Sequence, residues 1–140
     1  WVGALSPEDF VQYVEPHLSH ILKDLESLGV PVIHFGTGTQ SLLELQRRAG
    51  GTVMGIDWRT PLDEAIRRLG PKSIVQGNLD PIALFAPRTV LEEKLNGIVS
   101  AGRAAQGHIF NLGHGILPET EPAQVAWVAE RVHELGARSS

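Results

Sequence analysis

Four short apolar segments, each followed by a loop and then a helix pattern, constrain the fold of this chain more than any other feature. The segments are rich in β-branched residues and are bounded by glycine or polar residues, and they span 30–35, 53–57, 73–76 and 108–111. Strands that alternate with helices predict a parallel sheet, because parallel strands need long crossover connections. The sequence therefore predicts an α/β protein with four parallel strands.

The helix patterns have recognisable starts and stops. Ser6 can cap a first helix, and Pro7 suits its first turn. Pro16 should kink this helix or restart it, and Gly29 should end it. Further helices are predicted at 42–49, 61–69, 88–101 and 122–135, with a turn at 77–80 and a short helical turn from residue 81.

Two architectures satisfy this order of elements. One is an open flavodoxin-like parallel sheet covered on both faces. The other is half of a TIM barrel, whose complete form needs about 250 residues. Four strand–helix units within 140 residues favour the half-barrel, and this length predicts a single domain over residues 1–140.

Composition excludes several classes of function. The chain has no cysteine, which removes disulfides and thiolate zinc sites and fits a reducing cytosol. A formal net charge of −4 argues against a nucleic-acid partner. No apolar run approaches the roughly 18–20 residues that cross a bilayer. We therefore expect a cytoplasmic protein that binds neither nucleic acid nor membrane.

Polar residues cluster where the predicted strands end, which is where ligands bind in parallel α/β folds. Glycines accompany nearly all of them, which favours close backbone approach to a ligand. The candidate site residues are His34, Asp57, Arg59, Asn78, Asn111 and His114.

Most of these residues also have a structural explanation. His34 could be a core histidine, Asp57 could cap its loop, and Asn78 is an ordinary turn former. Arg59 could simply be solvated. His114, between two glycines, has the least structural reason to be there and is the strongest candidate.

Four segments also carry a family resemblance, in this order: PVIHFGTG at 31–38, GIDW at 55–58, QGNLDP at 76–81 and FNLGHGI at 110–116. Together they resemble uroporphyrinogen decarboxylases. The resemblance implies a (β/α)₈ barrel, a homodimer, and a carboxy-lyase that uses no cofactor or metal. Such an enzyme of haem biosynthesis converts uroporphyrinogen III to coproporphyrinogen III, turning four acetate side chains into methyl groups. The resemblance also implies that His114 contacts a carboxylate of the substrate.

The resemblance covers the last four units of that barrel. The family's arginine-rich loop, its aspartate for the pyrrole N–H groups, its tyrosine and its serine belong to the amino-terminal half. We therefore expect residues 1–140 to be a carboxy-terminal half-barrel that is inactive alone. Its expected partners are the anionic tetrapyrrole and either a complementary amino-terminal half or a second copy of the chain.

Two other interpretations remain open. A non-catalytic half-barrel would leave two open sheet edges and an uncovered face, and exposed strand residues such as Val53 and Ile109 would favour self-association. A cobalamin-linked methyltransferase is the other, because such enzymes share the barrel. They use zinc with histidine and cysteine ligands, so the absence of cysteine argues against it.

Overall fold

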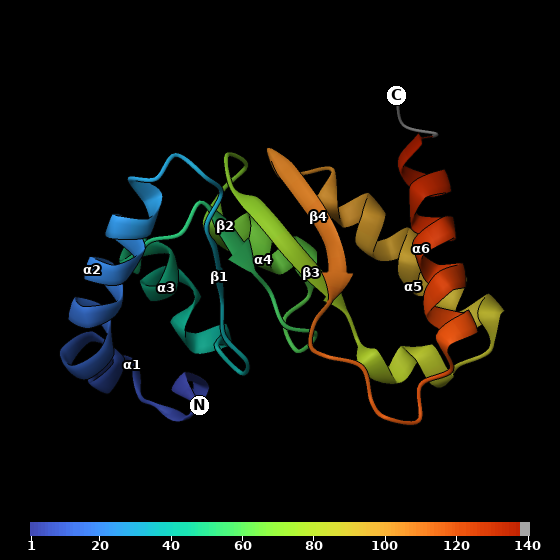
Figure 1. Ribbon diagram of the computed structural model, residues 1–140, viewed down its shortest axis with the longest axis horizontal. Helices are drawn as coiled ribbons and strands as arrows, with labels where there is room; N and C mark the ends of the chain where they lie inside the picture. Colours follow the sequence, from blue (N-terminus) through green and yellow to red (C-terminus); the bar gives the residue numbers. More distant parts are fainter. Residues whose placement is uncertain (138–140) are drawn as a thin grey trace.

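A computed structural model describes residues 1–137 and contains one parallel sheet (Figure 1). The strands follow the order β1-β2-β3-β4, so each crossover returns to the neighbouring position, and every adjacent pair is parallel. Their bounds are β1 Ile33–Phe35, β2 Val53–Gly55, β3 Ile74–Leu79 and β4 Gly107–Leu112. This confirms the predicted alternation of four parallel strands with helices.

Helices lie behind the sheet and at both of its ends. In Figure 1, α4 and α5 lie behind the strands, while α2 and α6 stand at opposite ends of the molecule. The α-helices are α1 Pro7–Asp9, α2 Glu15–Glu26, α3 Leu43–Ala49, α4 Leu62–Leu69, α5 Arg88–Gly102 and α6 Pro122–Ala137. The shorter helical segments are η1 Val2–Ala4, η2 Phe10–Val14, η3 Gln40–Leu42 and η4 Pro81–Phe85. Among residues 1–137, no helix is both long enough and apolar enough to cross a bilayer.

The first helical region restarts at its proline, as predicted. Ser6 caps α1 by accepting a hydrogen bond from the Asp9 N–H at 3.1 Å. A π-helical segment, η2, follows, and Pro16 lies in the first turn of α2. Proline lacks a backbone N–H and crowds the preceding turn, so a regular helix cannot run straight through this position.

Strand β3 is longer than its sequence pattern indicates. The predicted turn over 77–80 is wrong for 77–79, because Gly77, Asn78 and Leu79 pair in register with β4. The Gly77–Asn78 peptide bond is cis. The hydrogen bonds that β4 supplies outweigh the local turn propensity of Gly77 and Asn78. Asp80 ends the strand, and its side chain accepts from the Ile82 N–H at 2.9 Å to cap η4.

The hydrophobic core lies on the helix side of the sheet, in two clusters. One packs strand residues such as Met54 and Val75 against α4. The other joins the end of β3 to η4, α5 and α6. Burying a large apolar side chain stabilises the fold by about 1.5–3 kcal/mol, so these clusters supply most of its hydrophobic stabilisation.

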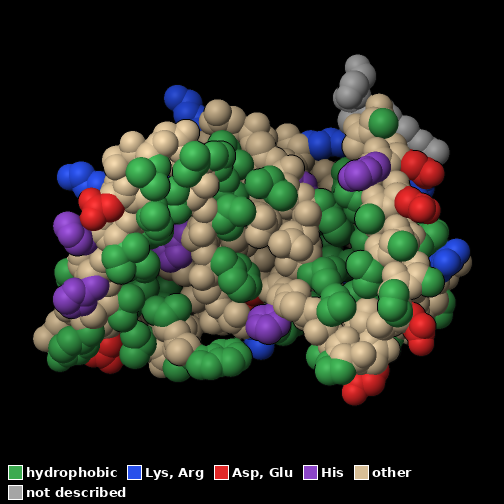
Figure 2. Space-filling view, in the orientation of Figure 1, with side chains coloured by type: hydrophobic (Ala, Val, Ile, Leu, Met, Phe, Trp, Pro, Cys, Tyr) green, Lys and Arg blue, Asp and Glu red, His purple; other side chains and the backbone are tan. Residues whose placement is uncertain are grey.

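The opposite face of the sheet, which we call the concave face, is left uncovered. Three of its apolar side chains are nearly half exposed, at 46% for Ile33, 44% for Phe35 and 44% for Ile109. The expected exposure of Val53 is wrong, because this register partner of Ile33 is 3% exposed. Figure 2 shows hydrophobic side chains gathered across the front of the sheet. A doubly wound open sheet has helices on both faces, whereas a barrel has them outside only. The fold is therefore a half-barrel, and the flavodoxin-like alternative is wrong.

Candidate functional site

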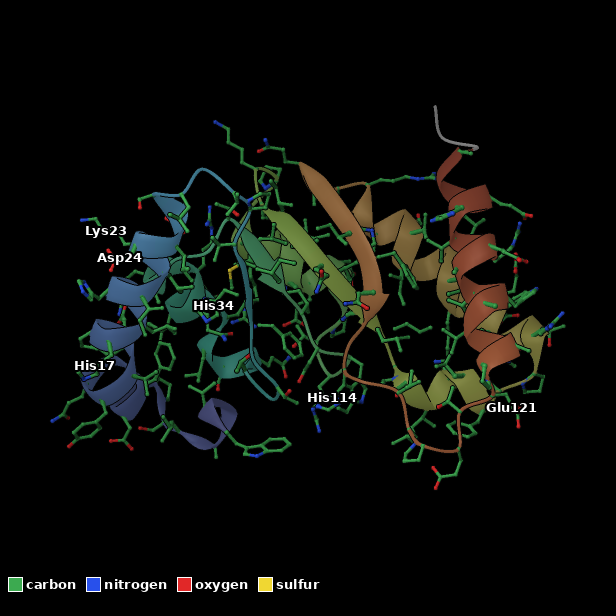
Figure 3. All side chains as sticks on the ribbon, in the orientation of Figure 1. His17, Lys23, Asp24, His34, His114 and Glu121 are labelled. Carbon is green, nitrogen blue, oxygen red and sulfur yellow. The ribbon has the colours of Figure 1, made fainter. Side chains whose placement is uncertain are left out.

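A cavity of about 380 Å³, here called the mouth cavity, opens where the strands end. Three of its lining side chains, Gln76, Asn111 and His114, can form hydrogen bonds. Figure 3 shows His114 just beyond the carboxyl end of β4. The remaining lining residues are Phe35, Ile56, Leu112, Gly115 and Ile116. The mouth cavity is therefore a partly apolar pocket with a few convergent polar groups, which is the usual make-up of a small-molecule site.

The aromatic wall of the cavity depends on a glycine in the neighbouring strand. Phe35 and Gly55 are partners in the parallel register. A Cβ atom added to Gly55 would lie 2.9 Å from Phe35 side-chain atoms. Gly55 therefore leaves the space that the Phe35 side chain fills on the concave face.

The polar wall comes from β3 and β4. Along β4, Ile109 and Asn111 alternate with less exposed residues that pack toward the helices, so both face the concave side. The Asn111 Oδ1 atom accepts a hydrogen bond from the Leu112 N–H at 2.8 Å. Gln76, half-buried, is the register partner of Ile109 and brings a second carboxamide to the cavity.

Asp57 is buried beside the cavity and organises two loops. Its carboxylate accepts hydrogen bonds from the Gly38 N–H at 2.5 Å, the Arg59 N–H at 3.0 Å and the Arg59 guanidinium at 3.1 Å. The Asp57 side chain is 2% exposed. Its charge therefore holds the loop after β1 against the loop after β2 and fixes Arg59, which is the capping role that its position in the sequence allowed.

The Trp58 ring contacts the side chains of both Arg59 and His114. The Arg59 guanidinium carbon lies 3.9 Å from the centroid of the Trp58 ring. The His114 ring meets the same indole edge-on, with centroids 5.9 Å apart and an interplanar angle of 78°. We call Trp58, Arg59 and His114 the mouth stack. Arg59 and His114 are both exposed, so a ligand can reach them. His114 lines the mouth cavity, whereas Trp58, Arg59 and Asn78 line a neighbouring cavity of about 620 Å³.

Asn78 supports the mouth stack from beneath. Its side-chain amide is buried and donates to the backbone oxygens of Asp57 at 2.9 Å and Thr60 at 2.6 Å. These bonds hold the two ends of the loop that carries Trp58 and Arg59. Asn78 does not line the mouth cavity.

The structure does not bring His34 to the cavity. Its imidazole is buried between β1 and α3, with Nδ1 3.0 Å from the Gly50 backbone oxygen and Nε2 3.5 Å from the Gln46 amide nitrogen (Figure 3). Strand alternation turns this residue toward the helices, while its neighbours Ile33 and Phe35 face the concave side. His34 occupies the position of a core histidine.

The sequence-based candidates omitted Phe35, Trp58 and Gln76. Strict alternation along each strand, applied from the exposed Ile33, would have selected Phe35. Trp58 lies in the predicted loop after the second strand and belongs to the GIDW segment, which is the signal that could have selected it. Within residues 1–137, no three histidine, aspartate or glutamate side chains gather in a group that could hold a metal ion.

A half-barrel with polar groups collected at the carboxyl ends of its strands defines this chain as part of a TIM-barrel type of protein. A model of the uroporphyrinogen decarboxylase (URO-D) family matches residues 1–135. The chain belongs to the uroporphyrinogen decarboxylase family.

Curated relatives support the same assignment. The chain is 56% identical over 135 residues to the uroporphyrinogen decarboxylase of Sorangium cellulosum, covering 96% of this chain and 39% of the relative. It is 54% identical over 138 residues to that of Salinispora tropica, covering 99% and 37%. The chain thus spans about two fifths of the length of these relatives.

A solved structure shares the fold. A methyltransferase from Methanosarcina mazei superimposes with a TM-score of 0.77 over 93% of this chain and 38% of its own, at 16% sequence identity. Identity this low shows a common fold and carries no argument about activity.

Proposed function

We propose that this chain, a single domain over residues 1–140, supplies the carboxy-terminal half of a uroporphyrinogen decarboxylase. Together with a complementary amino-terminal half, it would convert uroporphyrinogen III to coproporphyrinogen III. The observation that carries the proposal is the mouth cavity, which brings Gln76 of β3 together with Asn111 near the end of β4 and His114 just beyond it. The cysteine-free sequence also supports a cytoplasmic location.

The substrate provides its own electron sink. Protonation of a pyrrole ring carbon lets the bond between the acetate methylene and its carboxylate break, and carbon dioxide leaves as the electron pair enters the ring. A second proton then reaches the methylene carbon to form a methyl group, and the ring carbon releases its proton. Each cycle consumes one proton and needs no cofactor. The protein must bind the anion, exclude water from one acetate and present a proton donor.

The residues of the mouth divide these tasks by their chemistry. His114 and Arg59 are suited to bind carboxylates, since both can donate charge-assisted hydrogen bonds. Asn111 and Gln76 offer neutral amides, and Phe35 provides an apolar wall that disfavours water. Asp57 and Asn78 support the loops, and His34 is left outside the proposed site.

Charge explains why a second half is required. The substrate is an octa-anion, whereas this chain carries a formal net charge of −4. Binding such an anion calls for several guanidinium groups, and Arg59 alone cannot neutralise it. The further cations, and the contacts to the centre of the tetrapyrrole, are assigned by this proposal to the amino-terminal half.

Mixing experiments test the proposal. The chain alone should give no measurable coproporphyrinogen from uroporphyrinogen III, and addition of the amino-terminal part of the Sorangium cellulosum relative should restore turnover. His114→Gln should reduce that turnover at least tenfold, while His17→Gln, at an exposed position of α2, should leave it unchanged. Turnover by the chain alone, or equal activity of the His114 variant in the mixture, would contradict the proposal.

A second candidate is a half-barrel that pairs with a copy of itself. The observation in its favour is that the concave face is apolar and exposed, and that a groove of about 910 Å³ runs between β4 and α6. β1 and β4 are the outer strands of one parallel sheet. The β4 edge of one copy can therefore pair with the β1 edge of another, and two such contacts close an eight-stranded barrel.

A further inference from the structure

The Trp58 ring joins two loops that come from distant parts of the sequence. Arg59 belongs to the loop between β2 and α4, whereas His114 belongs to the loop between β4 and α6. Both side chains contact the same indole, one over its face at 3.9 Å and one edge-to-face at 5.9 Å between centroids. An aromatic face attracts a guanidinium, and an edge-to-face pair fixes the relative orientation of two rings.

The backbone around Trp58 is tightly packed against the loop that carries His114. A Cβ atom added to Gly113 would lie 2.4 Å from the Trp58 backbone nitrogen, so only glycine allows the two loops to approach this closely. The Gly113 N–H also donates to the Leu79 backbone oxygen at 2.7 Å. His114 therefore begins from a fixed backbone position directly beside Trp58.

The residues that follow Gly113 are not held by packing against the rest of the chain in the same way. His114, Gly115 and Ile116 are exposed, and a Cβ atom added to Gly115 would meet nothing within 4 Å. Within the described residues, the ring contact with Trp58 is the one that fixes the His114 imidazole. Arg59 differs in having a second anchor, because the Asp57 carboxylate accepts one of its guanidinium hydrogens.

We propose that Trp58 is a positioning residue that holds Arg59 and His114 as one carboxylate-binding pair. The proposal rests on the proposed function for the nature of its ligand, a carboxylate side chain of a tetrapyrrole. Trp58 itself contributes no proton and no charge. It keeps a donor at the mouth cavity and a donor at the neighbouring cavity on one indole, so that both can meet carboxylates of one tetrapyrrole without first becoming ordered, which lowers the entropic penalty of binding.

The chain contains a matched control for this contact. The guanidinium carbon of Arg88 on α5 lies 5.1 Å from the ring centroid of Trp127 on α6, and neither residue lines the mouth cavity. Trp127→Leu therefore removes a second indole–guanidinium contact of similar chemistry. Trp58→Phe keeps an aromatic ring at the mouth, while Trp58→Leu keeps apolar bulk without one.

Nuclear magnetic resonance of the labelled chain tests the proposal, with uroporphyrin I as the anionic probe. In the wild type, the ring signals of His114 and the Nε–H signal of Arg59 should both show ring-current shifts. Trp58→Leu should abolish both shifts together. In the mixture with the amino-terminal part of the Sorangium cellulosum relative, it should weaken uroporphyrin I binding about two- to fivefold, the range expected for an exposed cation–π contact. Trp58→Phe should retain part of both effects, and Trp127→Leu should change neither.

The proposal is overturned if Trp58→Leu leaves the His114 and Arg59 signals and the affinity at wild-type values. It is also overturned if Trp127→Leu weakens binding equally. If circular dichroism shows that Trp58→Leu fails to fold, the partial effect expected of Trp58→Phe decides. The ring-current shifts are measured without ligand, so they stand or fall separately from decarboxylase turnover.

Discussion

The two faces of the sheet carry similar apolar residue types but differ in how far their side chains are exposed to solvent. On the helix side, Met54 is 1% exposed and Val75 is fully buried. On the concave side, Ile33, Phe35 and Ile109 are each more than two fifths exposed. The difference shows that an apolar pattern predicts a face that needs covering. Whether the chain itself covers that face depends on the number of strands, because four strands cannot close a barrel on themselves.

The largest expected effect comes from shortening one apolar side chain on each face. Met54→Ala should lower the free energy of unfolding by about 2–5 kcal/mol, because it leaves a cavity in a packed core. Ile109→Ala should lower it by about 1 kcal/mol or less, because solvent already reaches that side chain. Urea denaturation at low protein concentration measures both. Equal losses would mean that the two faces are equally packed.

A smaller effect is expected at the end of the sheet, where the two faces meet the loops. Asp57→Asn keeps the shape of the side chain but removes the charge that accepts hydrogen bonds from Gly38 and Arg59. The free energy of unfolding should fall by about 1.5–3 kcal/mol. Asp63→Asn, an exposed residue of α4, is the control and should change it by about 0.5 kcal/mol. If Asp57→Asn leaves the free energy of unfolding unchanged, the Asp57 carboxylate does not hold the two loops together.

The smallest effect concerns the outer surface of the helix layer. A hydrogen bond from Arg68 holds the pKa of Glu44 below its ordinary value, and this pair links α3 to α4. Because the folded-state pKa is lowered, the stabilisation is fully present above the unfolded-state pKa of about 4.3 and is lost as pH falls through the folded-state value.

Glu44→Gln should therefore lower the free energy of unfolding at pH 7 by about 0.2–1 kcal/mol, since solvent reaches more than half of the Glu44 side chain. The difference from wild type should shrink as pH falls through the folded-state pKa of Glu44. Glu119→Gln, an exposed carboxylate in the loop before α6, serves as the control. Urea denaturation at several pH values decides, and a difference that grows at acid pH would mean that the pair with Arg68 does not stabilise the charged form of Glu44.

The order of elements could be predicted from sequence because it depends on local patterns: β-branched runs, helix caps and glycine stops. The extent of β3 could not, because Gly77 and Asn78 look like turn residues until β4 lies beside them. The site followed the same division. His114 could be singled out because it stands between glycines after the last strand. The orientation of His34 and the meeting of Trp58 with His114 depend on packing between segments far apart in sequence.

The concave face as a pairing surface is tested most directly by sedimentation equilibrium of the chain alone across micromolar concentrations. Wild type should exceed its monomer mass of 15.2 kDa as concentration rises, and the double variant Ile33→Asp and Ile109→Asp should remain a monomer. Ile82→Asp, at an isoleucine that is 58% exposed but lies outside this face, should associate like wild type. A wild-type chain that stays monomeric throughout, or an Ile82 variant that dissociates as fully as the double variant, would contradict this account.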